Sequence, residues 1–100
     1  MTPSEKFLAA MRRMPLVAIL RGLTPGEAPA IGQALVQAGF LLLEVPLNSP
    51  QPLESIRLLA HQHPLALVGA GTVLTPQQVR DVHDSGGELI VSPNFNADVV

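Results

Sequence analysis

The sequence of 100 residues contains no cysteine, tryptophan or tyrosine, and Lys6 is its one lysine. Without cysteine the chain has no disulfide, no thiolate nucleophile and no cysteine-ligated zinc. Lysine and arginine total six against eight aspartate and glutamate, which gives a formal net charge of −2. Because no excess of positive charge is available to hold nucleic-acid phosphates or anionic lipid, we expect neither as a partner.

Long hydrophobic runs are also absent. The apolar stretch 7–11 is too short for the core of a signal peptide and is bounded by charged residues. The stretch 40–47 is interrupted by Glu44 and Pro46, and it falls well below the roughly 18 apolar residues that a membrane span requires. We therefore expect a soluble, cytoplasmic protein without a membrane segment.

Apolar content is high in spite of these absences. Hydrophobic residues make up 47% of the chain and charged residues 14%, a composition typical of a packed chain and not of a disordered one. A chain of this length forms one domain at most. The sequence therefore predicts a single domain over residues 1–100.

Four apolar runs recur along the chain at a nearly constant spacing. They begin at residues 16, 41, 65 and 89, in steps of 24 or 25. The stretches between them have the apolar period of helices, and the same period predicts a helix over residues 1–14. Apolar strands that alternate with helices are typical of parallel sheets. The predicted class is α/β, either a doubly wound sheet or half of a (β/α)8 barrel.

Hydroxyl residues followed by proline predict where three helices begin, with the hydroxyl as N-cap. Glu27 and Gln78 each lie three residues after such a hydroxyl and predict capping boxes. Pro29 should kink or delay its helix, because it falls in the second turn. Gly39 and Gly86 are expected to end helices. The three hydroxyl–proline pairs are Thr24-Pro25, Ser49-Pro50 and Thr75-Pro76.

Polar residues gather where the predicted strands end, which is where both candidate folds bind ligands. Glu44 lies inside an otherwise apolar strand, where burial should raise the pKa of its carboxyl group and suit it to proton transfer. The alternative is a structural carboxylate paired with Arg21, which follows the first strand. Arg21 in turn either clamps a substrate carboxylate or only neutralises Glu44.

Weaker candidates follow the other strands. Thr72 ends a Gly-Ala-Gly-Thr segment that either brings backbone and a hydroxyl close to a ligand or forms a tight turn. Asn48 contacts a ligand or completes the turn before Ser49. Pro93 and Asn94 follow the fourth strand as possible substrate contacts, although Asn94 equally suits a helix cap.

Metal and nucleotide sites are not predicted. His61 and His63 lack an acidic neighbour to complete a metal site, so we expect solvated side chains, and His83 has no marked functional signal. Arg21-Gly22-Leu23 follows the first strand where a dinucleotide-binding fold would have a glycine-rich loop, so no dinucleotide cofactor is expected.

Taken together, five blocks of sequence resemble the 2-keto-3-deoxy-6-phosphogluconate/4-hydroxy-2-oxoglutarate aldolase family, most closely its galactonate branch. The resemblance covers about residues 15–100. Where this chain has Asn48, the gluconate branch typically has arginine, which favours the galactonate branch. The blocks are 15–22 (PLVAILRG), 38–40 (AGF), 43–50 (LEVPLNSP), 68–73 (VGAGTV) and 90–94 (IVSPN).

The resemblance implies a (β/α)8 barrel of which this chain covers the N-terminal half, with a helix over 1–14 and roughly the first four βα units over 15–100, truncated. It implies a class I aldolase that uses a Schiff base, without metal or cofactor, in carbohydrate metabolism. Its substrate would be a phosphorylated 2-keto-3-deoxy sugar acid, cleaved to pyruvate and glyceraldehyde 3-phosphate. Glu44 would be the general acid/base, and Arg21 and Thr72 would bind the pyruvate carboxylate. The family also suggests a homotrimer.

The Schiff-base lysine is the departure from this pattern. Lys6 precedes the first strand, whereas the resemblance places the family's lysine on a later strand, beyond residue 100. Arginine cannot replace it, because a guanidinium stays protonated. We therefore expect the chain alone to be inactive. The alternatives are a gluconate-specific aldolase, a non-catalytic half-barrel that binds a keto acid or assembles with another half, and a lysine-independent phosphosugar isomerase or synthase that uses Glu44.

Overall fold

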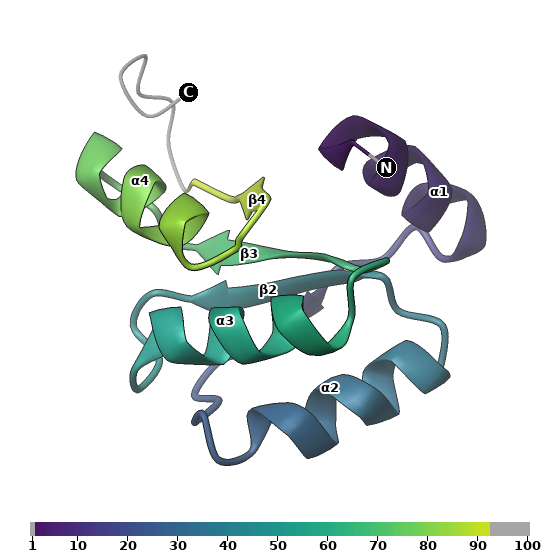
Figure 1. The fold of residues 1–100 in the computed structure, drawn as a ribbon, viewed down its shortest axis with the longest axis horizontal. Helices are drawn as coiled ribbons and strands as arrows, with labels where there is room; N and C mark the ends of the chain where they lie inside the picture. Colours follow the sequence, from purple (N-terminus) through teal and green to yellow (C-terminus); the bar gives the residue numbers. More distant parts are fainter. Residues whose placement is uncertain (1, 93–100) are drawn as a thin grey trace.

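The fold was analysed in a computed structural model that describes residues 2–92 (Figure 1). Helices and strands alternate along the chain, as the spacing of the apolar runs predicts. In order they are α1 (Pro3–Arg13), β1 (Ala18–Ile19), α2 (Ala28–Gln37), β2 (Leu42–Pro46), α3 (Pro52–Gln62), β3 (Leu67–Gly71), α4 (Pro76–Asp84) and β4 (Leu89–Ile90).

The four strands form one parallel sheet in the order β1-β2-β3-β4. Helix α3 contacts both α2 and α4, so these three helices form one layer, while α1 packs against β3 and lies across the strands from α2 (Figure 1). A doubly wound sheet reverses its strand order and carries its crossover helices on both faces. The uninterrupted order with one layer of crossover helices is that of a (β/α)8 barrel. The predicted α/β class and barrel architecture are therefore confirmed.

The main core lies between the sheet and the layer of crossover helices. Alternate strand residues point toward these helices, because side chains in a strand alternate between its two faces. Leu43 and Val45 of β2 are fully buried there, and they share one hydrophobic cluster with Ile56 and Leu59 of α3 and Val82 of α4. We refer to this side of the sheet as the helix-covered face.

The opposite side of the sheet, here called the inner face, is only partly covered. Ala10 of α1 packs on Leu42 and Leu67 near the start of β2 and β3. Further along, Ile19 is 61% exposed, although it is the register partner of Glu44. Within residues 2–92, β1 pairs only with β2 and β4 only with β3, so each has an open edge. Exposed apolar strand residues and open edges are surfaces that further strands of a barrel cover.

Helix starts agree with the sequence in one case and differ in two. Thr75 and Gln78 form the predicted capping box of α4. Helix α2 begins at Ala28 and not after Thr24, because Pro29 delays it as its position suggested, and the Thr24 hydroxyl donates to the Glu27 carboxylate in a preceding turn. Helix α3 begins at Pro52, two residues later than Ser49-Pro50 predicted.

Helix ends follow the prediction. Gly39 and Gly86, each directly after the C-cap residue of α2 or α4, adopt φ values of +106° and +95°. This left-handed region is open to glycine at little steric cost, which is why glycine so often follows the last residue of a helix.

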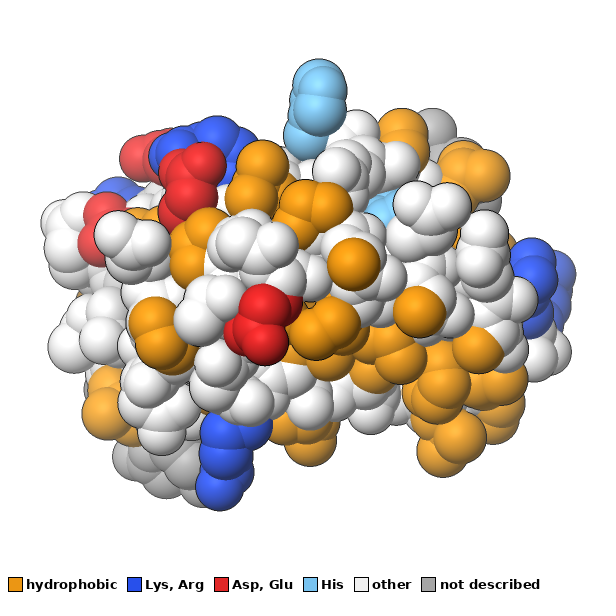
Figure 2. Space-filling view, turned by 90° about the horizontal axis from the view of Figure 1, so that it is seen from below, with side chains coloured by type: hydrophobic (Ala, Val, Ile, Leu, Met, Phe, Trp, Pro, Cys, Tyr) orange, Lys and Arg blue, Asp and Glu red, His pale blue; other side chains and the backbone are white. Residues whose placement is uncertain are grey.

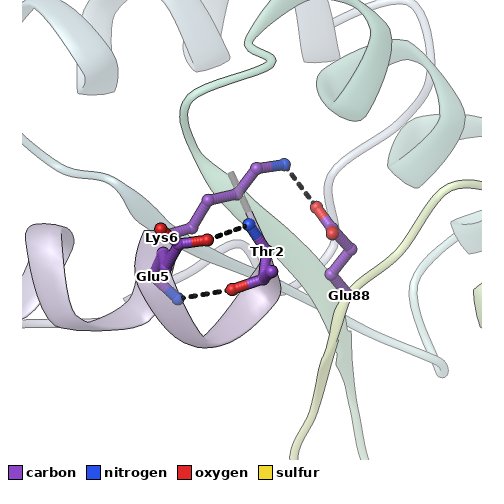
Figure 3. Close-up of polar contacts among 4 residues, drawn as sticks. All are labelled: Thr2, Glu5, Lys6 and Glu88. Carbon is purple, nitrogen blue, oxygen red and sulfur yellow. Dashed lines mark hydrogen bonds and ion pairs between the residues drawn. The ribbon is translucent and has the colours of Figure 1, made fainter.

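An ion pair connects helix α1 to a residue close to the C-terminal end of the described chain. The Lys6 ammonium donates to the Glu88 carboxylate at 2.5 Å, just before β4, while Thr2 and Glu5 cap the start of the helix (Figure 3). The capping box of Thr2 and Glu5 was not predicted, although it has the same spacing as that of Thr75 and Gln78. The ion pair fixes α1 across the amino ends of the strands.

The outer side of the helices also exposes apolar residues. Seen from the side of α2, hydrophobic side chains lie among polar ones and gather toward one end, with lysine and arginine at the margins (Figure 2). Ile31 of α2 is 37% exposed, and Leu65, in the loop between α3 and β3, is 67% exposed. None of the helices between residues 2 and 92 is long and apolar enough to cross a membrane.

Candidate functional site

Glu44 lies in the middle of β2 on the inner face, and only 5% of it is exposed. Its carboxylate occupies the space beside Gly71 of β3. A β-carbon built at Gly71 would lie 2.1 Å from Glu44 Oε1, so only glycine leaves room for the carboxylate in this position. The last glycine of the Gly-Ala-Gly segment is thus explained by the acid on the neighbouring strand, and not by a turn alone.

The environment of Glu44 favours its protonated form. Burial raises the pKa of the Glu44 carboxyl group above its ordinary value of 4.5, and the positive charge of Arg21 opposes part of this effect. Within residues 2–92, no cationic nitrogen lies within 4.0 Å of the carboxylate. The structure therefore does not contain the close Glu44–Arg21 ion pair of the alternative interpretation.

Arg21 follows β1 at the point where that strand leaves the sheet. The N–H of the preceding Leu20 donates to the backbone carbonyl of Glu44 at 2.8 Å. The chain then turns at Gly22, which has a φ of +78°. Arg21 is exposed, so its guanidinium is free to meet a ligand close to Glu44.

Thr72 is the first residue after β3 and has a φ of +59°. A β-branched residue rarely adopts this left-handed conformation, and such strain persists only where surrounding contacts impose it. Here the next residue is fixed, since the N–H of Val73 donates to the carbonyl of Val91 at 3.2 Å. The exposed Thr72 therefore sits at the carboxyl edge of β3, directly after the glycine that accommodates Glu44.

The structure brings Arg21, Glu44, Thr72 and Asn48 to the same edge of the sheet. Asn48 is exposed in the loop after β2, within a turn closed by the Ser49 N–H and the Pro46 carbonyl at 3.0 Å. The other two predicted substrate contacts, Pro93 and Asn94, lie outside the described residues.

The histidines do not form a metal site. No group of three metal-binding side chains gathers in the part of the chain that the structure describes. His61 is exposed as predicted, and His83, for which no exposure was predicted, is exposed as well. The prediction for His63 is wrong, because its Nε2 is buried without a hydrogen-bond partner. A β-carbon built at Gly32 would lie 3.3 Å from that nitrogen, so α2 approaches His63 closely. The burial comes from a packing contact that local sequence does not reveal.

Among the cavities formed by the described residues, only a small one reaches the candidate site, and it does so at Arg21. One cavity, of about 590 Å³, lies between the start of α3 and α4, and its lining includes Gln51, Glu54 and Asp81. A smaller one of about 290 Å³ touches Arg21 and Gly22. Because the inner face is open within residues 2–92, the candidate site is an uncovered surface at the sheet edge, and we base its chemistry on the residues and not on a cavity.

Comparison with known proteins gives the family. The family described as "Aldolase: KDPG and KHG aldolase" matches residues 8–100. The 2-dehydro-3-deoxy-6-phosphogalactonate aldolase of Escherichia coli (strain K12) is 48% identical over 89 residues, which cover 88% of this chain and 43% of that protein. A probable aldolase of the same name from Rhizobium meliloti (strain 1021) is 51% identical over 87 residues, 86% of this chain and 41% of that protein.

Solved structures agree with this result. A structure described as "Native KDPGal structure" superposes with a TM-score of 0.83 at 49% identity, over 87% of this chain and 43% of that chain. The KDPG aldolase from Legionella pneumophila, captured with pyruvate as a covalent carbinolamine intermediate, superposes with a TM-score of 0.82 at 29% identity, over 99% of this chain and 46% of that one. The chain spans less than half the length of these relatives, and over that length it belongs to the KDPG and KHG aldolase family.

Proposed function

We propose that the protein containing these residues is a class I aldolase that cleaves 2-dehydro-3-deoxy-6-phosphogalactonate to pyruvate and glyceraldehyde 3-phosphate. The observation that carries the proposal is the buried Glu44 carboxylate, which sits beside Gly71 at the carboxyl edge of the sheet and is flanked by Arg21 and Thr72. In a barrel enzyme this edge is where catalytic residues come together.

Glu44 is the proton-transfer group in this proposal. Forming a carbinolamine from a keto group and an amine, and cleaving the carbon–carbon bond, both move protons at oxygen atoms of the substrate. Burial raises the pKa of the Glu44 carboxyl group, and a raised pKa makes it easier for a carboxyl group to hold a proton and pass it on. The lack of an ion pair leaves its oxygens available for this task.

Arg21 and Thr72 are the groups that bind the pyruvate carboxylate. A guanidinium presents several N–H donors to a carboxylate, and a threonine hydroxyl adds another donor. Both residues are exposed at strand ends next to Glu44. The arrangement supports a bound keto acid whose carbonyl carbon faces the inner side of the sheet.

The amine of the Schiff base must come from outside residues 1–100. Lys6 lies on α1 at the amino ends of the strands and is engaged by Glu88 (Figure 3). The candidate site lies at the opposite, carboxyl ends. In our proposal residues 1–100 form the first four βα units of one barrel domain, and a lysine on a later strand completes the site without metal or cofactor.

The galactonate configuration is supported by two observations. Asn48 stands where the resemblance gives the gluconate branch an arginine. The two galactonate aldolases reported above are 48% and 51% identical to this chain, whereas the KHG/KDPG aldolase of Escherichia coli (strain K12) is 35% identical. We therefore place the gluconate epimer second.

The complete protein is proposed to be a cytoplasmic homotrimer. Exposed apolar side chains on the outer side are consistent with association between copies (Figure 2). A chain 49% identical to this one belongs to a structure described as a cage "designed by fusing symmetric oligomeric domains". Light scattering on the natural protein tests this part of the proposal, and a monomer contradicts it.

The test of the reaction uses the natural full-length protein. Pyruvate release is followed with lactate dehydrogenase on both epimers, and the imine is trapped with borohydride in the presence of pyruvate and located by mass spectrometry. We expect faster release from the galactonate epimer and one modified lysine. Release from neither epimer contradicts the proposed aldolase, and pyruvate binding without trapping favours the non-catalytic half-barrel.

A further inference from the structure

Ser49 makes a contact that its predicted role does not explain. It was expected to cap the helix after β2, but α3 begins at Pro52 and Ser49 takes no part in its cap. Ser49 is instead 6% exposed, and its Oγ accepts a hydrogen bond at 3.1 Å from the backbone N–H of Gly22, a residue 27 positions earlier in the chain. The bond joins the loop after β1 to the loop after β2.

This bond lies on one side of Arg21, and a second bond lies on the other. The preceding residue, Leu20, donates its N–H to the Glu44 carbonyl at 2.8 Å. The following residue, Gly22, donates to Ser49 Oγ. Arg21 is therefore held between two hydrogen bonds whose acceptors belong to β2 and its loop. The bond to Glu44 uses only backbone atoms, so Ser49 supplies the part of this arrangement that depends on a side chain.

Ser49 is itself fixed relative to Glu44. Its N–H donates to the carbonyl of Pro46 at 3.0 Å, and Pro46 ends the strand that carries Glu44 two residues earlier. The serine hydroxyl thus projects from a turn anchored to β2. Gly22, with a φ of +78°, is the flexible point at which the chain after Arg21 would otherwise be free to move.

We infer that Ser49 is a positioning residue, which holds Arg21 beside Glu44 by binding the Gly22 N–H. The inference rests on the proposed function in that it gives Arg21 the task of binding the substrate carboxylate. Ser49 itself does not touch the reacting atoms. Removing the Ser49 hydroxyl breaks the hydrogen bond to Gly22, so the turn at Gly22 becomes mobile and the Arg21 side chain samples more positions. Substrate binding then weakens, while proton transfer by Glu44 continues.

The kinetic test compares two buried serines in the natural full-length protein. Ser85 is also 6% exposed and makes one hydrogen bond through its side chain, to the Asp81 carbonyl at 2.9 Å, but it lies at the end of α4. For Ser49→Ala we expect KM to rise about five- to tenfold with kcat changed less than about twofold. Ser85→Ala is expected to keep the wild-type KM, and an equal rise in both variants overturns the inference.

Two further comparisons separate positioning from general stability. Ser49→Thr keeps an oxygen that can accept the hydrogen bond. Ser49→Val has nearly the same shape as the threonine variant but no acceptor, so only the valine variant should raise KM. In an Arg21→Ala background, Ser49→Ala should add no further rise, because it acts through Arg21. An additional, independent rise there contradicts the inference. If Ser49→Ala does not fold, the threonine and valine pair decides.

Amide hydrogen exchange gives a readout that does not depend on catalysis. Ser49→Ala should speed exchange of the Gly22 N–H and leave that of Leu20 unchanged, whereas unchanged exchange at Gly22 overturns the inference. If the wild type releases no pyruvate, the proposed function fails by itself. The role of Ser49 is then decided by Gly22 exchange together with the affinity for pyruvate, measured by titration calorimetry in wild type and Ser49→Ala.

Discussion

The two faces of the sheet differ in what their side chains do. On the helix-covered face, the β2 residues Leu43 and Val45 are apolar and fully buried against helices. On the inner face, alternate positions of the same strand carry Leu42, packed on α1, and then Glu44. From the amino toward the carboxyl ends of the strands, the inner face of β2 thus changes from an apolar packing residue, Leu42, to a buried acid, Glu44.

With the proposed role of Glu44, this difference means that one parallel sheet places stability and activity in different regions. The helix-covered face and the amino end of the inner face bury apolar area, which is the main source of folding free energy. The carboxyl end of the inner face instead holds a buried acid, a glycine that makes room for it and a strained Thr72. Each of these features costs stability. Substitutions on the helix-covered face should therefore lower the free energy of unfolding, whereas substitutions of the polar residues at the carboxyl end of the inner face should mainly lower activity.

The largest effect is expected on the inner face. Glu44→Gln removes the proton-transfer group while keeping its size, so kcat should fall by about 10²- to 10⁴-fold with pyruvate affinity nearly unchanged. Steady-state kinetics and pyruvate titration on the full-length protein measure both quantities. A fall of less than about tenfold means that Glu44 is not the acid/base.

Two isoleucines test whether the inner face is covered in the complete protein. Ile56→Ala on the helix-covered face should lower the free energy of unfolding by about 2–5 kcal/mol, because Ile56 is fully buried. Ile19 is 61% exposed within this chain. If later strands complete the barrel, Ile19→Ala should cost a similar amount in the full-length protein, as measured by urea unfolding. A cost below about 1 kcal/mol would show that the inner face stays open.

Arg21 should affect binding more than turnover. Arg21→Ala removes hydrogen bonds to a charged ligand group, so KM should rise about ten- to a hundredfold. Arg57 offers a matched control, since it is an exposed arginine of α3 that pairs with Glu54 and lies away from the site. An unchanged KM in Arg21→Ala, or an equal rise in Arg57→Ala, contradicts the carboxylate-binding role.

Glu44 should also leave a signature in stability. Because burial raises the pKa of the Glu44 carboxyl group above 4.5, the folded protein binds this proton more tightly than the unfolded chain does. The free energy of unfolding therefore falls as the pH rises from the pKa of the unfolded chain to the higher pKa of the folded protein. Glu44→Gln does not titrate. It should therefore be more stable than wild type at neutral pH, and this advantage should vanish below about pH 4, where both states are protonated. Urea unfolding at the two pH values measures the difference, and a constant difference contradicts the pKa argument.

The smallest expected effect concerns the ion pair of α1. Lys6→Met keeps most of the side-chain stem but removes the contact with Glu88, and should cost less than about 1 kcal/mol because the pair is partly exposed. A double-mutant cycle with Glu88→Gln isolates the pair, and its coupling energy should shrink at high salt. A coupling that salt does not change indicates a contact other than an ion pair.

Much of the fold and part of the site follow from the sequence. The 24- to 25-residue spacing and the apolar runs predict the order of strands and helices, and the isolated Glu44 predicts the site, since a carboxylate in an apolar strand is a local signal. The roles of Ser49 and His63 could not be predicted, because each depends on a residue distant in sequence, Gly22 in one case and Gly32 in the other. The start of α3 was placed too early for the same reason, since Ser49 binds Gly22 and does not cap the helix. The later start of α2 is different, because Pro29 is a local signal that predicted the delay.

The contact between Lys6 and Glu88 has a consequence for biosynthesis. The two residues lie 82 positions apart, so the partner of α1 leaves the ribosome long after α1 itself. At synthesis rates of about 5–20 residues per second, that interval is on the order of 4 to 16 s. During this time the side of α1 that packs on β2 and β3 has no partner until those strands have been made, and Lys6 has none until Glu88 has been made. Helix α1 is therefore made well before the residue that anchors it, and the nascent chain has to keep the apolar residues of α1 from other contacts until then.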